Sequence, residues 1–95
     1  MAKVSQFYNK NQFIITTNEG TYFQSYDSVI AYKDRKTGII KVTPYWDYSN
    51  TTRKHFYLFL EDYTRYTPSG KKCEYVRNLI KENKIELVDD GELDY

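Results

Sequence analysis

The stretch that decides the fold runs from Thr51 to Tyr63 and reads TTRKHFYLFLEDY. Apolar side chains recur in it at intervals of three and four residues, which is the spacing of one face of an α-helix. Ser49, just before it, is the first choice of N-cap and Asn50 the second. The pattern predicts an amphipathic helix whose apolar face must be covered by another element. That face holds Thr52, Phe56, Phe59, Leu60 and Tyr63, and Tyr57 is expected to point away from it.

A second amphipathic helix is predicted from about Lys71 to Asn83, with Thr67-Pro68 as its N-terminal cap. Its apolar face holds Cys73, Val76, Leu79, Ile80 and Asn83. Residues 85–88 then alternate in polarity, which favours a short strand at the edge of a sheet. The acidic tail, residues 90–95, is expected to fray from Gly91 onward.

The first half of the chain reads as β-structure. Four runs rich in β-branched and aromatic residues are separated by turn residues such as Asn18-Glu19-Gly20 and by the polar loop at residues 34–38. Pro44 ends the last run because it cannot donate a hydrogen bond to a sheet. The predicted strands span residues 12–17, 21–26, 28–33 and 39–43.

Together these elements predict an α+β fold of one domain spanning residues 1–95. An antiparallel meander of four to five strands is packed on one side by two helices, because each amphipathic element needs the others to bury its apolar face. We expect one sheet face to meet the helices. The contacts would join Phe13, Ile15, Phe23, Val29 and Ile40 to Phe56, Phe59, Leu60, Val76 and Ile80.

Composition excludes several classes of protein. The 95 residues include 11 tyrosines, and 18% of the chain is aromatic, which argues against disorder. No apolar run is long enough to span a membrane, and no secretory signal is expected at the N-terminus. The single cysteine, Cys73, rules out an internal disulfide and a cysteine-built zinc site. We therefore expect a small soluble protein that carries no metal or cofactor.

Charge is distributed unevenly along the chain. Residues 31–54 carry six basic and two acidic side chains, whereas residues 86–95 carry five acidic side chains and no basic one. Such asymmetry indicates either a solvated loop and tail, or a basic face for an anionic partner with an acidic tail that imitates nucleic acid.

No set of residues suited to catalysis stands out. His55, the only histidine, is expected at the boundary of the helix face with a backbone carbonyl or an acid as partner. Cys73 lies on a predicted buried face and is expected to act as a small apolar residue. Residues 69–72, Ser-Gly-Lys-Lys, lack the rest of a phosphate-binding loop. We therefore expect no catalytic residues and a non-enzymatic role.

The densest cluster of aromatic and basic residues surrounds the start of the first predicted helix. Aromatic rings offer stacking surfaces and cations offer phosphate contacts, which is how proteins hold single-stranded nucleic acid. The same rings could instead seal the corner between sheet and helix, or form a protein interface. The candidate binding residues are Tyr45, Trp46, Tyr48, Arg53, Lys54 and Tyr57, with Arg35 and Lys36 from the preceding loop.

At these residues the sequence resembles a family of small proteins of phages and bacterial mobile elements. The likeness spans about residues 21–60 and includes FQSYDSVIA at 23–31 and the string YWDYSxTTxKHxxxFL at 45–60. The family has no assigned function, so the resemblance implies a genetic context and no catalytic residues. That context implies a protein that binds host machinery, and an anti-defence inhibitor of the anti-CRISPR kind is one form it takes.

Two functions follow as expectations. The first is a non-enzymatic protein that binds a host protein, such as a defence effector that handles nucleic acid. The second is a single-stranded nucleic-acid-binding protein that uses the aromatic and basic corner. The chain is expected to be a monomer, or a homodimer formed by pairing the exposed edge of the strand at residues 12–17.

Overall fold

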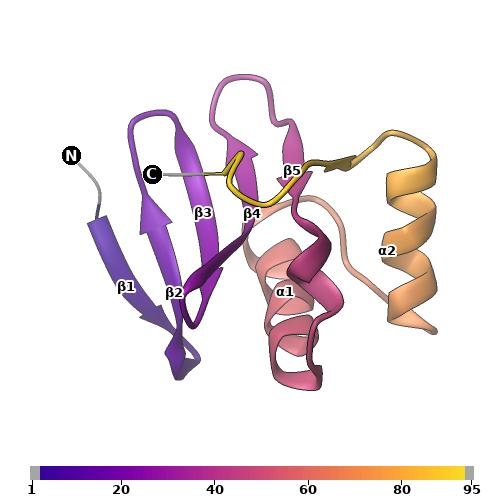
Figure 1. Cartoon of the computed structure of the whole chain (residues 1–95). Coiled ribbons are helices and arrows are strands. Elements are labelled where there is room, and N and C mark those ends of the chain that lie inside the picture. Colours follow the sequence, from indigo (N-terminus) through magenta and orange to yellow (C-terminus); the bar gives the residue numbers. More distant parts are fainter. Residues whose placement is uncertain (1–2, 94–95) are drawn as a thin grey trace.

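A computed structural model describes residues 3–93 and confirms the α+β class (Figure 1). Six strands form one mixed sheet whose spatial order follows the chain. The first five pair antiparallel as a meander, and the last joins parallel to its neighbour. The strands are β1 (Lys3–Phe7), β2 (Asn9–Thr16), β3 (Gly20–Ser25), β4 (Ser28–Asp34), β5 (Ile40–Val42) and β6 (Glu86–Leu87). The helices are the 3₁₀-helix η1 (Pro44–Asp47), α1 (Asn50–Tyr63) and α2 (Lys72–Lys81).

Both predicted helices are confirmed at their positions in the sequence, but their end residues differ from the prediction. Ser49 caps α1 as expected, since its side chain accepts a hydrogen bond from the Thr52 backbone N–H at 3.1 Å. Helix α2 is shorter than predicted and begins after Lys71, without a side-chain cap, so Thr67-Pro68 lies in the connecting loop. Among residues 3–93, no helix has the length and apolar character needed to cross a membrane.

The larger core lies between the sheet and the two helices. Phe23, on β3, stacks on Phe59 of α1 with ring centroids 5.9 Å apart, and both side chains are fully buried. Val76 and Leu79 of α2 close the same core from the side of β5 and β6. This core joins residues from the first five strands, the residue before β6 and both helices, including Phe7, Ile14, Ala31, Val42, Phe56, Leu60 and Ile85.

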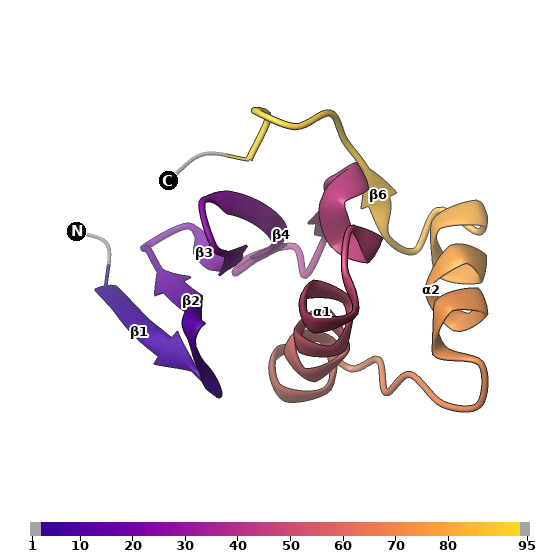
Figure 2. The ribbon, with the colours of Figure 1, turned by 60° about the horizontal axis from the view of Figure 1, so that its bottom comes forward.

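A smaller core covers the opposite face of the sheet. The chain after β6 turns back across this face, so that the sheet has α1 on one side and the C-terminal segment on the other (Figure 2). Val88 and Leu93 of that segment pack against Ile15, Tyr22 and Tyr32. Leu93 is therefore anchored, contrary to the expected fraying from Gly91 onward, and residues 94 and 95 lie outside the described part of the chain.

The predicted faces of two strands are wrong for a physical reason. Ile14 of β2 faces the helices, whereas Phe13 and Ile15 belong to the smaller core, as does Val29 of β4. Both faces of β2 are covered, so apolar residues follow one another along this strand. The sequence therefore does not alternate between apolar and polar residues, and it does not indicate which side chains face the helices. The predictions for Phe23 and Ile40 are confirmed.

A β-bulge displaces the alternation in β4. Register with β3 shifts between Phe23 and Gln24, so Ile30 and Ala31 both reach the larger core. Ile80 is only partly buried there, because Leu79 takes the inward position on α2. Tyr63, predicted buried, is exposed and lies over the edge of the larger core against Phe59.

Strand β1 was missed by the sequence analysis. It pairs along β2 from Lys3 opposite Thr16 to Phe7 opposite Asn9. Its first four residues are exposed, so it has little of the apolar signal that marks a strand. Because β1 covers β2, the edge at residues 12–17 is not free, and the pairing expected for a homodimer is ruled out at that strand.

Gly20 provides a test of the sheet's packing. A Cβ at Gly20 would lie 2.2 Å from the Lys33 backbone oxygen and 2.6 Å from the Tyr32 ring. We expect Gly20→Ala to lower the free energy of unfolding by about 3 kcal/mol in chemical denaturation, because backbone of β4 must move. Gly70→Ala is the control: its site is open and its φ is +62°, so only about 1 kcal/mol of backbone strain is expected. Equal losses would contradict the steric account.

Candidate functional site

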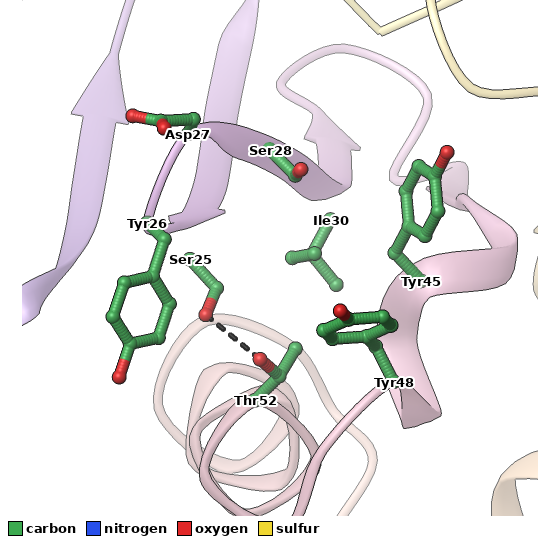
Figure 3. A pocket seen from close by; sticks show the side chains of 8 residues that line it. All are labelled: Ser25, Tyr26, Asp27, Ser28, Ile30, Tyr45, Tyr48 and Thr52. Atoms are coloured by element: carbon green, nitrogen blue, oxygen red, sulfur yellow. Dashed lines mark hydrogen bonds between the residues drawn. The ribbon is translucent and has the colours of Figure 1, made fainter.

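A cleft of about 340 Å³ opens between the β3–β4 turn and the start of α1. Figure 3 shows Tyr26 on one side, Tyr45 and Tyr48 on the other, and Ser25, Ile30 and Thr52 between them. We call it the tyrosine cleft, and its lining is Ser25, Tyr26, Asp27, Ser28, Ile30, Tyr45, Tyr48 and Thr52.

The β3–β4 turn supplies one wall. Tyr26 has a φ of +55°, in the left-handed region that a tight hairpin turn requires. Its backbone is held from two sides, because its N–H donates to the Asn11 oxygen at 2.7 Å and its oxygen accepts from the Gln24 amide at 2.7 Å. Tyr26 is therefore presented to solvent by a fixed backbone, with 52% of its surface exposed.

Helix η1 and the α1 cap supply the other wall. Pro44 cannot continue β5 and begins a single turn of 3₁₀-helix. This turn places Tyr45 and Tyr48 together, with ring centroids 6.4 Å apart at near right angles. Tyr48 is 80% exposed, so its ring makes almost no contribution to the core.

Hydroxyl groups form the floor. The Ser25 and Thr52 hydroxyls are hydrogen-bonded at 2.9 Å and join the end of β3 to the first turn of α1. Ser49 donates to the same Thr52 hydroxyl at 3.1 Å. Gln12, directly opposite Ser25 in the sheet, is fully buried, and neither polar atom of its amide has a hydrogen-bond partner among the described residues. The floor of this cleft is thus formed by buried polar side chains.

Tyr45 divides the tyrosine cleft from a neighbouring cleft of about 280 Å³. Its hydroxyl donates to Asp90 Oδ2 at 2.7 Å, which ties η1 to the C-terminal segment. This hydrogen bond, followed by the negative charge of Asp90, raises the pKa of Tyr45. The neighbouring cleft is lined by Asp27, Ser28, Val29, Tyr45, Asp90, Gly91 and Leu93. Among residues 3–93, no lysine or arginine lines either cleft, whereas two carboxylates do.

Trp46 does not join the tyrosine cleft. It is only 4% exposed and packs against Phe56, with ring centroids 5.7 Å apart. Arg77 of α2 covers its ring at 5.8 Å and pairs with Asp47 at 3.1 Å. Trp46 therefore closes the corner between sheet and helix, and the prediction that it offers a stacking surface is corrected.

Tyr57 faces α2 rather than the cleft, and Arg53 does not line the cleft either. Tyr57 is half-buried against the larger core, contrary to the prediction that it points away, and burial raises its pKa. Lys72 of α2 lies 5.9 Å from its ring centroid. Arg53 is hydrogen-bonded to Asn50, and Lys54 is exposed on the next position of α1.

Arg35 and Lys36 lie far from the three tyrosines that line the cleft. They follow the last residue of β4, whereas the tyrosine cleft is built at its first residues. A strand rises about 3.3 Å per residue, so roughly 20 Å separates the two ends of β4. The structure therefore splits the predicted corner: Tyr45 and Tyr48 join a cleft lined by no cation, and the predicted basic residues lie elsewhere.

His55 and Cys73 occupy the positions expected of structural residues. His55 is buried, and its Nδ1 lies 2.7 Å from the Thr51 backbone oxygen one turn earlier in α1. Cys73 is half-buried and packs against the larger core. Within the part of the chain that the structure describes, no three His, Cys, Asp or Glu side chains are grouped as metal ligands would be.

Sequence reasoning missed Ser25, Tyr26, Asp27 and Asp90. Tyr26 was predicted as the last residue of a strand, and nothing in the sequence indicated that the turn at this point meets residues 45–52. Asp90 was read as part of a frayed tail, and only the packing of Val88 and Leu93 brings it beside Tyr45.

A family model for a family of unknown function, DUF8033, matches residues 1–76. The chain belongs to this family. The match ends within α2, so β6 and the segment that carries Asp90 lie beyond it, while all eight residues that line the tyrosine cleft lie inside it. Searches of curated proteins and of solved structures find no match.

The hydrogen bond between Tyr45 and Asp90 predicts a pH effect. Because the bond raises the pKa of Tyr45 above its ordinary value of 10.0, it stabilises the folded chain below pH 10 and is lost as pH rises through the raised pKa. We expect Asp90→Asn to lower the pKa of Tyr45 toward 10.0 in an NMR titration of its ring carbons. Asp89→Asn removes a neighbouring charge without this bond and is the control; an equal shift in both variants would contradict the assignment.

Proposed function

We propose that this chain is a non-enzymatic binding protein whose tyrosine cleft contacts a protein partner. The observation that carries the proposal is the gathering of Tyr26, Tyr45 and Tyr48 around one cleft, from turns that are far apart in the sequence. Tyrosine is among the residues that contribute most to protein interfaces, because a large rigid ring carries a polar end. A folded protein gains little by exposing such rings, so their collection at one place supports a binding role.

The charge around the cleft supports a protein partner over a nucleic acid. Asp27 and Asp90 line the cleft and its neighbour, where they would repel phosphate groups. The nucleic-acid alternative depended on rings and cations acting together, yet Trp46 is buried and Arg35 and Lys36 lie at the far end of β4. No observation now favours it over protein binding.

The class of partner follows from the resemblance in the sequence. Phage and mobile-element proteins act on the cell that carries them, so we propose a bacterial host protein as partner and the cytoplasm as the place of action. An anti-defence inhibitor is the specific form of this proposal. The acidic segment from Glu86 to Glu92 supports it, because such a segment is suited to a basic groove that normally holds nucleic acid.

An affinity capture tests the proposal. The immobilised chain is expected to retain a stoichiometric protein from lysate of its bacterial host, and the variant carrying Tyr26→Asn and Tyr48→Ser is expected to retain at least tenfold less. Asparagine is chosen at residue 26 because it tolerates the positive φ. Circular dichroism should show that the variant stays folded, since both rings are largely exposed.

Tyr8→Asn is the matched control. Tyr8 is 65% exposed, also has a positive φ and lies at the β1–β2 turn outside the cleft. Loss of capture in the cleft variant alone supports the proposal, whereas equal capture by all three proteins would reject the cleft as the interface. Salt-sensitive binding of oligonucleotides at low ionic strength, measured by fluorescence anisotropy, would instead revive the nucleic-acid alternative.

A further inference from the structure

The inside of the tyrosine cleft is neutral and rich in hydroxyl groups. Figure 3 shows the Tyr48 ring reaching over the cleft toward Ile30, with the Ser28 hydroxyl on the opposite side. The Ser25 and Thr52 hydroxyls lie at the floor and use one proton between them for their own hydrogen bond. The Thr52 oxygen also accepts from Ser49, so the oxygens of Ser25 and Ser28 have the greater capacity to accept a hydrogen bond from a ligand. The cleft thus offers acceptors, one apolar side chain and an exposed aromatic ring.

The rim of the cleft carries negative charge. The Asp27 carboxylate stands at the outer end of the β3–β4 turn and points away from the interior (Figure 3). Asp90 lies across Tyr45 from the cleft, and Asp89 and Glu92 are close to it in the sequence. At physiological salt these carboxylates act over about 8 Å, so they attract a cation to the mouth of the cleft. They do not contact the cation once it lies inside the cleft. The whole chain has a net charge of +1, whereas the described residues that line the two clefts include Asp27 and Asp90 and no lysine or arginine.

We propose that the tyrosine cleft receives an arginine side chain of the protein partner. A guanidinium stacks on aromatic faces and carries five N–H donors, which matches the Tyr48 ring and the hydroxyl acceptors. Its methylene stem is apolar and suits the side chain of Ile30. A lysine presents a compact, strongly hydrated charge with three donors and stacks less well, so it fits the neutral interior less well. This inference rests on the proposed function and names the group that the cleft recognises.

The size of the cleft agrees with one side chain. About 340 Å³ is near the lower end of the range for pockets that bind small molecules, and the cleft shares part of its lining with a neighbour of about 280 Å³. The peptide that carries the arginine would pass over Asp27, Ser28 and Tyr45, the three residues shared by both clefts, and beside Asp90.

Short peptides test the inference without the natural partner. The probe is acetyl-Gly-Gly-Arg-Gly-Gly-amide, compared with the same peptide carrying citrulline or lysine, and binding is followed by the backbone amide NMR signals of Ser28, Tyr48 and Thr52. Citrulline keeps the shape of arginine and removes its charge. We expect the arginine peptide to shift these signals and the citrulline and lysine peptides to bind about tenfold and about threefold more weakly.

Variants of the full chain locate the contact. Tyr48→Leu is expected to weaken the arginine peptide about three- to fivefold, whereas Tyr48→Phe, which keeps the ring, changes little. Asp27→Asn is expected to weaken it and to reduce its dependence on salt. Glu61→Gln, an exposed acid on α1 outside both clefts, is the control and should have no effect.

Three results would overturn the inference: no shift at the cleft amides, equal binding of arginine and citrulline peptides, or equal effects of Asp27→Asn and Glu61→Gln. These results are separable from failure of the proposed function. A captured partner that depends on Tyr48 but keeps its binding after its surface arginines are changed to glutamine would reject the arginine contact and leave the protein-binding role standing.

Discussion

The structure depends on the contact between the centre of the sheet and α1, where Phe23 stacks on Phe59. Both rings are fully buried, and their separation of 5.9 Å fixes the helix across the strands. The hydrogen bond between Ser25 and Thr52 sets the position along the helix, because it joins the end of β3 to the first turn of α1 at 2.9 Å. Each residue that lines the tyrosine cleft either lies within a few residues, along the sequence, of a side chain that makes one of these two contacts, or belongs to η1.

Burial on both faces distinguishes this sheet from a simple two-layer arrangement. The helices cover one face, and Val88 and Leu93 of the C-terminal segment cover the other. The second cover explains the aromatic composition in part, because Tyr22 and Tyr32 pack beneath it with ring centroids 4.6 Å apart. It also explains why Asp90 reaches Tyr45: the segment is held by apolar contacts on each side of the acidic residues.

The tyrosines consequently fall into two groups with different physical roles. Tyr22 and Tyr32 are core residues, and Tyr57 lies half-buried at the helix pair. Tyr26 and Tyr48 have most of their rings in solvent, although a packed ring would stabilise the fold more. Rings held outward by a fixed turn and a capped helix are arranged for contact with another molecule, which is the basis of the binding proposal.

The sequence by itself determined the α+β class, the meander, the place of both helices, the cap at Ser49 and the structural role of His55, because spacing and turn chemistry act locally. Only the tertiary structure decided which face of β2 meets the helices, since apolar residues cover both faces there. It also decided that Trp46 is buried while Tyr48 is exposed, and that Asp90 faces Tyr45. These outcomes depend on contacts between residues far apart in the chain, which no local pattern encodes. The predicted basic and aromatic corner therefore became an acidic-rimmed cleft.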